Sequence, residues 1–136
     1  MGGIKSGKKN KKIEARKDYV SWFEIPAIDF QQAVEFYQYI FGITMQQNIT
    51  EANAMAYFPT NTGIGGAVVA GSGYVPSDSG SLIYLNGGDN LSLVLDKIEP
   101  AGGRIIMPKT LISEESGYFA VFIDSQGNKL ALHSLN

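Results

Sequence analysis

The chain has 136 residues, a length typical of one domain, and no cysteine, which excludes disulfides, thiolate nucleophiles and zinc–thiolate sites. No apolar run reaches eighteen residues, and the basic N-terminus has no apolar stretch of a secretory signal behind it, so we expect a cytoplasmic protein. The net charge of −2 combines two unlike parts. Residues 1–17 carry seven basic side chains and one acidic, whereas the other 119 residues carry four basic and twelve acidic.

Residues 1–17 are predicted to form a flexible basic tail, because they contain too few apolar side chains to order themselves by burial. A basic tail can also be an arm for nucleic acid or an anionic membrane. This tail lacks the aromatic residues that stack on single strands, and the acidic domain behind it would repel phosphate. We therefore expect neither a nucleic-acid nor a membrane partner.

The first module is predicted from the order of its local signals. Residues 19–25 are aromatic and β-branched, which indicates a strand, and Pro26 ends that run. Asp29 is a suitable N-cap for a helix with an apolar stripe that ends at Phe41, and Gly42 suits a left-handed C-cap. Three short strands are then expected near residues 44–48, 53–58 and 64–70.

The second module repeats this order after a turn-rich linker over residues 71–80. A strand is expected over residues 82–85, and Asp89 or Asn90 caps a helix with an apolar stripe formed by Leu91, Val94, Leu95 and Ile98. The spacing of 13 residues from Asp29 to Gly42 recurs from Asp89 to Gly102, offset by 60. Further strands are predicted near 104–107, 117–124 and 128–134.

These elements predict one α+β domain over residues 18–136, made of two βαβββ modules at about 18–70 and 81–134. The mixed sheets are expected to form a curved, cup-like sheet with the helices on its outer face. Because strand side chains alternate, Phe23 and Ile25 should face the first helix. Trp22 and Glu24 on the same strand should then face the cup, the usual place for a ligand.

Two segments carry a resemblance to a known family. The run Trp22–Pro26, followed by Asp29 and by Phe41-Gly42, resembles the opening of vicinal oxygen chelate proteins, the glyoxalase/bleomycin-resistance/dioxygenase superfamily. Phe122–Leu130 resembles their closing hairpin, with Ser125 where proline is usual. The resemblance covers about residues 18–134 and is nearest to uncharacterised proteins related to lactoylglutathione lyase. It implies a divalent metal in the cup, bound by His, Glu or Gln from four strands.

The four corresponding positions in this sequence do not supply those donors. The first and last positions are Trp22 and Ala131, and the best match for the second is Ala67. The third falls among Ser81, Leu82 and Ile83, of which only Ser81 offers an oxygen atom. A neutral hydroxyl is a poor sole ligand for such an ion. We therefore predict that the family's metal site is absent and that the protein has no cofactor.

Polar and aromatic side chains remain as candidates for the cup. Glu24 and His133 lie two positions past the first and last ligand positions, and a carboxylate and an imidazole facing one pocket can act as an acid–base pair. Both residues also have a structural interpretation. Glu24 could form an ion pair or cap an amide at the sheet edge, and His133 could be a partly exposed structural histidine near the C-terminus. The predicted ligand contacts are Trp22, Glu24, Phe58, Tyr84, Phe122 and His133.

The leading hypothesis is a metal-free protein that binds a small organic molecule in its cup, as the sequestering bleomycin-resistance proteins do. The alternatives are a glyoxalase-related lyase or isomerase that uses Glu24 and His133 or an atypical metal site, and a structural domain for dimerisation. A homodimer is expected, because exposed sheet edges favour association.

Overall fold

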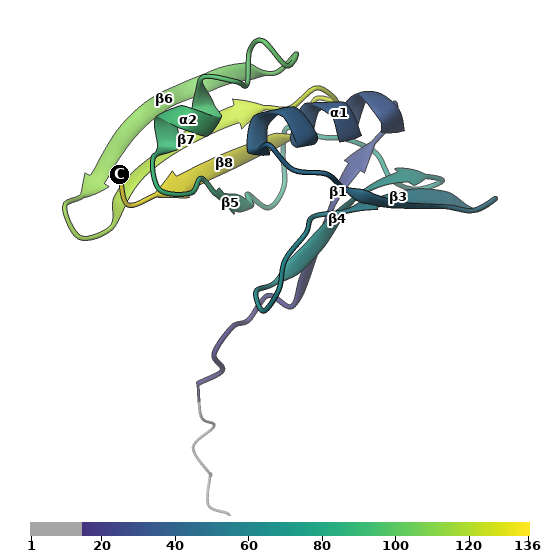
Figure 1. The fold of residues 1–136 in the computed structure, drawn as a ribbon, viewed down its shortest axis with the longest axis horizontal. Helices are drawn as coiled ribbons and strands as arrows, with labels where there is room; N and C mark the ends of the chain where they lie inside the picture. Colours follow the sequence, from purple (N-terminus) through teal and green to yellow (C-terminus); the bar gives the residue numbers. More distant parts are fainter. Residues whose placement is uncertain (1–14) are drawn as a thin grey trace, which may run out of the picture.

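The computed structural model describes residues 15–136, so the predicted tail lies outside it except for its last three residues. The elements, in chain order, are β1 (Trp22–Ala27), α1 (Phe30–Phe41), β2 (Gln46–Ile49), β3 (Asn53–Tyr57), β4 (Gly65–Gly71), β5 (Tyr84–Asn86), α2 (Leu91–Leu95), β6 (Arg104–Ser113), β7 (Gly117–Ile123) and β8 (Lys129–Ser134). The predicted sequence of elements, βαβββ twice, is confirmed (Figure 1).

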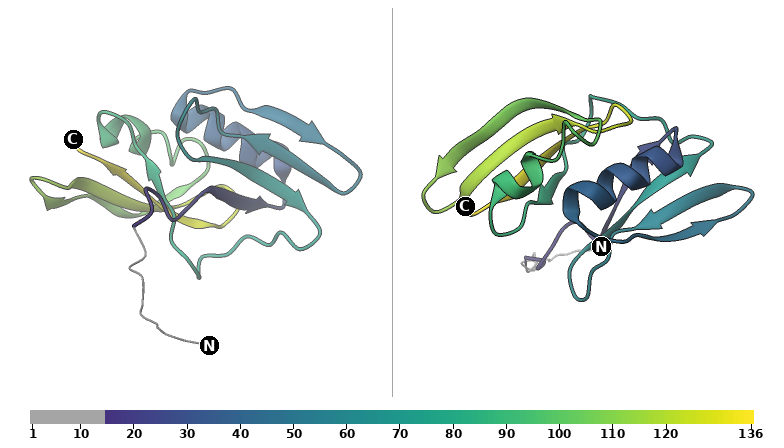
Figure 2. Two further views of the ribbon diagram at one scale, coloured as in Figure 1. Left: turned by 90° about the horizontal axis from the view of Figure 1, so that it is seen from below. Right: turned by 45° about the horizontal axis from the view of Figure 1, so that its top comes forward.

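The strands form two four-stranded mixed sheets, with the orders β1-β4-β3-β2 and β5-β8-β7-β6, which we call the N-terminal and C-terminal sheets. In each sheet the first strand pairs in parallel with the last, and the other pairs are antiparallel. α1 and α2 lie side by side in the middle of the molecule, with one sheet flanking each (Figure 2). The α+β prediction is confirmed. Among residues 15–136, no helix is long and apolar enough to cross a bilayer.

Helix α1 begins and ends at its predicted caps. The Asp29 carboxylate accepts a hydrogen bond from the amide of Gln32 at 3.1 Å, which satisfies a free donor of the first turn. Gly42 takes up the left-handed conformation at φ 63°, a C-cap that glycine adopts without strain. Five side chains of α1 are buried, namely Ala33, Val34, Phe36, Tyr37 and Ile40.

One hydrophobic core extends across both modules. Phe36 of α1 stacks on Phe122 of β7, with the ring centroids 6.2 Å apart. Beside it, the Tyr37 hydroxyl donates a hydrogen bond to Asp124 at the end of β7. Helix α1 of the first module therefore packs against the second module as well as against its own sheet.

Several strand boundaries differ from the prediction, and β1 begins three residues late, at Trp22. Pro26 lies inside β1 rather than ending it, which is tolerated because β1 is an edge strand with β4 as its only partner. β5 begins at Tyr84, two residues late, and β6 continues to Ser113 through Pro108 with shifts in register. β6 is also an edge strand, so a proline and bulges interrupt few hydrogen bonds there.

Candidate ligand-binding site

Each sheet has one face without a helix, which we call its open face. On β1, Phe23, Ile25 and Ala27 turn toward α1, so alternation places Trp22 and Glu24 on the open face. The register then continues this face across the N-terminal sheet. Glu24 lies opposite Ala67 of β4, and Ala67 lies opposite Tyr57 of β3.

An aromatic group with one carboxylate occupies this open face, and we call Trp22, Glu24, Tyr57 and Tyr74 the N-terminal cluster. The rings of Trp22 and Tyr57 lie 6.2 Å apart, and the indole Nε1 of Trp22 donates a hydrogen bond to Glu24 Oε2 at 3.2 Å. A β-carbon at Gly65 would lie only 3.0 Å from the Trp22 ring, so glycine lets the indole lie against the sheet. Trp22 nevertheless remains 44% exposed.

Tyr74 joins the cluster from the linker between the modules. The negative charge of Glu24 raises the pKa of the Tyr74 phenol, and a hydrogen bond to the same carboxylate adds to the effect. Half-buried Tyr74 thus brings the linker to the open face at β1. This residue is not among the predicted contacts, because turn-rich composition predicts a linker but not the surface on which the linker lies.

A second group of polar and aromatic side chains lies on the open face of the C-terminal sheet. Asn86 of β5 lies opposite His133 of β8, and His133 lies opposite Phe119 of β7. The ring of Tyr84 is 6.5 Å from that of Phe119. We call Tyr84, Asn86, Phe119 and His133 the C-terminal cluster.

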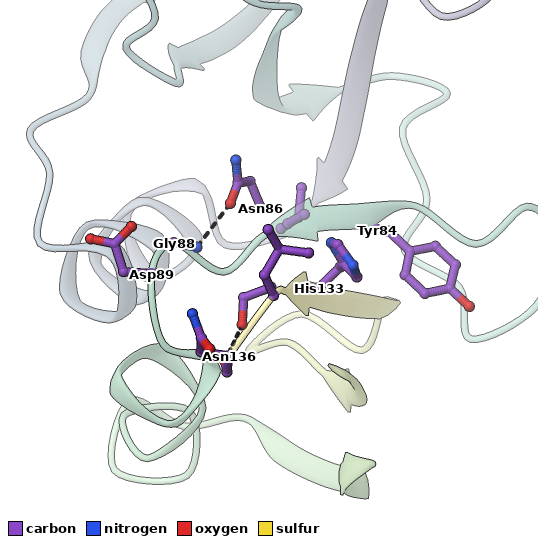
Figure 3. Close-up of a pocket in the computed structure, with 9 residues that line it drawn as sticks. Tyr84, Asn86, Gly88, Asp89, His133 and Asn136 are labelled. Carbon is purple, nitrogen blue, oxygen red and sulfur yellow. Dashed lines mark hydrogen bonds between the residues drawn. The ribbon is translucent and has the colours of Figure 1, made fainter. Parts of the chain in front are cut away.

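A hollow of about 700 Å³ adjoins this cluster, a volume within the usual range for small-molecule pockets. It is lined by Tyr84, Leu85, Asn86, Gly88, Asp89, His133, Ser134, Leu135 and Asn136. In the view of Figure 3, Tyr84 and Asp89 lie at opposite ends of this group, with Asn86 and His133 between them. An aromatic ring, amides, a carboxylate and an imidazole therefore line one concave surface.

The imidazole of His133 already has a partner. Its Nε2 lies 2.6 Å from the carbonyl oxygen of Ser116, and a carbonyl can only accept, so Nε2 carries the proton. In the tautomer that carries this single proton, Nδ1 is left as an acceptor. Glu24 lies on the other sheet, with Trp22 as its donor, and no hydrogen bond or ion pair joins it to His133 within residues 15–136. A single chain therefore does not assemble the hypothesised acid–base pair.

Two of the six predicted ligand contacts lie in the core or pack against it. Phe122 is fully buried on the helix-covered face of β7, where it stacks on Phe36. Phe58 packs against Tyr37, with the ring centroids 5.5 Å apart, and against Phe23. The prediction that Phe58 and Phe122 face the cup is wrong, because both rings pack against aromatic side chains of the core under α1.

A family model, the Glyoxalase/Bleomycin resistance protein/Dioxygenase superfamily, matches residues 19–132. The chain belongs to this superfamily. Solved structures share its fold at low sequence identity. TnmS3 from Streptomyces sp. CB03234, described as an antibiotic binding protein, is 19% identical with a TM-score of 0.64, over 88% of this chain and 98% of that chain.

Two further solved structures show the same likeness of fold. A glyoxalase/bleomycin resistance protein/dioxygenase family enzyme from Burkholderia phytofirmans PsJN has 17% identity and a TM-score of 0.64, over 85% of this chain and 98% of that chain. A glyoxalase I mutant from Zea mays has 16% identity and a TM-score of 0.62, over 82% of this chain but 43% of that chain. No curated protein matches the sequence significantly.

The divalent metal that the superfamily implies does not fit the residues of this member. Trp22 lies across from Gly65, Ala67 lies across from Glu24, and Ala131 lies across from Tyr84. Within the described part of the chain, no three His, Asp or Glu side chains come together as a metal-binding group. Hard and borderline cations need such oxygen or nitrogen donors, so these positions do not provide a site for the superfamily's metal.

Proposed function

We propose that this protein binds a small organic molecule on the open faces of its sheets and does so without the metal of its superfamily. The observation that carries the proposal is the exposure of two large aromatic side chains on these faces. Trp22 is 44% exposed and Tyr84 is 54% exposed, each beside polar groups that can orient a ligand. Aromatic surface of this kind is typical of binding sites.

Two further observations support binding. The hollow beside Tyr84 is large enough for a small molecule, and its amides, imidazole and carboxylate could fix the orientation of a ligand. A structure with this fold is described as an antibiotic binding protein, a role that needs no turnover.

We further propose that the protein acts as a homodimer. β1 and β5 are edge strands, each with a single partner, and the open faces beside them are not covered by a helix. No ring contact or hydrogen bond joins the N-terminal cluster to the C-terminal cluster within the described residues. A second copy is the partner that could bring Trp22 of one chain near Tyr84 of the other, and light scattering on the purified protein tests for it.

The binding proposal is tested by a small-molecule panel read by thermal unfolding and by fluorescence. The chain has one tryptophan, Trp22, so its emission reports the N-terminal cluster alone. We expect at least one compound to raise the unfolding temperature of chelator-treated protein, and Trp22→Ala or Tyr84→Ala to remove that shift. Tyr39→Ala is the matched control, because Tyr39 is an equally exposed ring on α1. The proposal fails if no compound stabilises the protein, or if both open-face variants respond as the wild type does.

A further inference from the structure

We infer that the N-terminal cluster recognises an organic cation, such as a quaternary or alkylated ammonium group. The inference rests on the proposed function and names the ligand class of one of its two surfaces. It is carried by the juxtaposition of the Glu24 carboxylate with the rings of Trp22, Tyr57 and Tyr74.

The carboxylate of Glu24 has no cationic partner among residues 15–136. The neutral indole of Trp22 donates to it at 3.2 Å, and the phenol of Tyr74 lies beside it. Both groups can hold the carboxylate in place, but neither neutralises its charge. A cationic ligand would bind this surface more tightly than a neutral one, because only the cation is attracted by the charge of the carboxylate.

The aromatic rings provide a second attraction for the same kind of ligand. Ala67 lies between Glu24 and Tyr57 in the register and is fully buried, so the larger side chains around it form the surface. Glu24 and Tyr57 are two strands apart, or about 10 Å in backbone spacing. A cation above this surface would meet the electron-rich faces of the rings, and tryptophan binds cations best.

The charge of the folded domain favours the same ligand class. Residues 18–136 carry four basic and twelve acidic side chains, so the domain repels anions and attracts cations. In contrast, the anions that many small-molecule proteins bind would need lysine or arginine on the open face. The only charged side chain in the N-terminal cluster is acidic.

The test compares ligands of similar shape but different charge. The probes are choline and its neutral counterpart 3,3-dimethyl-1-butanol, and benzyltrimethylammonium and its anionic counterpart phenylmethanesulfonate. Binding is followed by Trp22 emission and by the single indole N–H signal in NMR, since that N–H group contacts Glu24. We expect each cation to bind at least about tenfold more tightly than its counterpart, and more weakly at high salt.

Glu24→Gln is the decisive variant, because it keeps the size and a hydrogen-bond acceptor while it removes the charge. We expect it to weaken cation binding about tenfold and to leave neutral probes unaffected. Glu35→Gln is the matched control, because Glu35 is an exposed carboxylate on α1. Its cation affinity should equal that of the wild type.

Three results would overturn the inference. If the neutral or anionic probe binds as tightly as its cation, or if Glu24→Gln binds cations unchanged, charge recognition is absent although the proposed function stands. If none of the four probes binds while a compound from the wider panel does, the ligand belongs to another class. If the wider panel also fails, the proposed function falls together with the inference.

Discussion

Tyr37 of α1 donates a 2.7 Å hydrogen bond to Asp124, 87 residues further along the chain, and both side chains are buried. Asp124 also accepts hydrogen bonds from the backbone amides of Gln126 and Asn128. The Asn128 side chain then donates to the carbonyl of Pro26 at 2.7 Å. This network joins the helix of the first module to the last hairpin of the second.

The first prediction concerns this contact. Tyr37→Phe keeps the ring but removes the hydroxyl, so a buried carboxylate loses a donor. We expect the free energy of unfolding to fall by about 1.5–3 kcal/mol in urea titrations. Tyr39→Phe, at an exposed position on the same helix, should change it by less than about 0.5 kcal/mol. Equal stability of the two variants would contradict a stabilising role for the buried hydrogen bond.

The second prediction is an alkaline loss of stability. Burial, followed by the charge of Asp124 and the hydrogen bond to it, raises the pKa of Tyr37 well above its usual value. The native state therefore keeps this proton at a pH where the unfolded chain releases it. Stability from Tyr37 should be fully present below about pH 10 and then fall by up to about 1.4 kcal/mol per pH unit. The prediction is refuted if the free energy of unfolding depends on pH in the same way for the wild type and Tyr37→Phe up to pH 11.

Local signals in the sequence were sufficient to predict the ends of α1 and the side chains that β1 places on its open face. Asp29 and Gly42 cap α1 where their spacing predicts, because a cap depends on a few neighbouring residues. On β1, alternation alone does not say which face is open. The prediction also required that Phe23 and Ile25 pack against the apolar stripe of the helix. Trp22 and Glu24 were then predicted to lie on the opposite, open face.

Contacts between distant segments could not be predicted in this way. On β7, alternation separates Phe119 from Phe122 but does not say which one faces the helices, and the stack of Phe122 on Phe36 decides it. Tyr74 reaches Glu24 from a linker with no periodic pattern. The bond from His133 to Ser116 likewise depends on how β7 and β8 pair.

The third prediction concerns the turn that supports His133. Gly117 has φ 86°, and an added β-carbon would collide with the backbone carbonyl of Ser134. Gly117→Ala should destabilise the protein by at least about 2 kcal/mol, measured by urea or thermal unfolding. Gly73→Ala is the control, because its φ is 88° but no atom lies within 4 Å of the new methyl group. It should cost only about 1 kcal/mol, and equal losses would show that the collision has no effect.

The fourth prediction uses Tyr74 to probe the position of its linker. Because the charge of Glu24 opposes ionisation of this phenol, Glu24→Gln should lower the pKa of Tyr74 toward its ordinary value. The measurement is an NMR titration of the tyrosine rings, with Tyr74→Phe to assign the signal. Glu35→Gln should leave the titration unchanged. An identical Tyr74 titration in Glu24→Gln would mean that the linker does not lie against β1.

The measurement that tests the central claim most directly is equilibrium binding to Trp22 in protein freed of metal. Saturable quenching or shift of its emission by an organic compound, retained in chelator and unchanged by added nickel, zinc, iron(II) or manganese, is the predicted result. Binding that appears only after one of these ions is restored, or emission that no compound changes, would contradict metal-free binding at the open face of the N-terminal sheet.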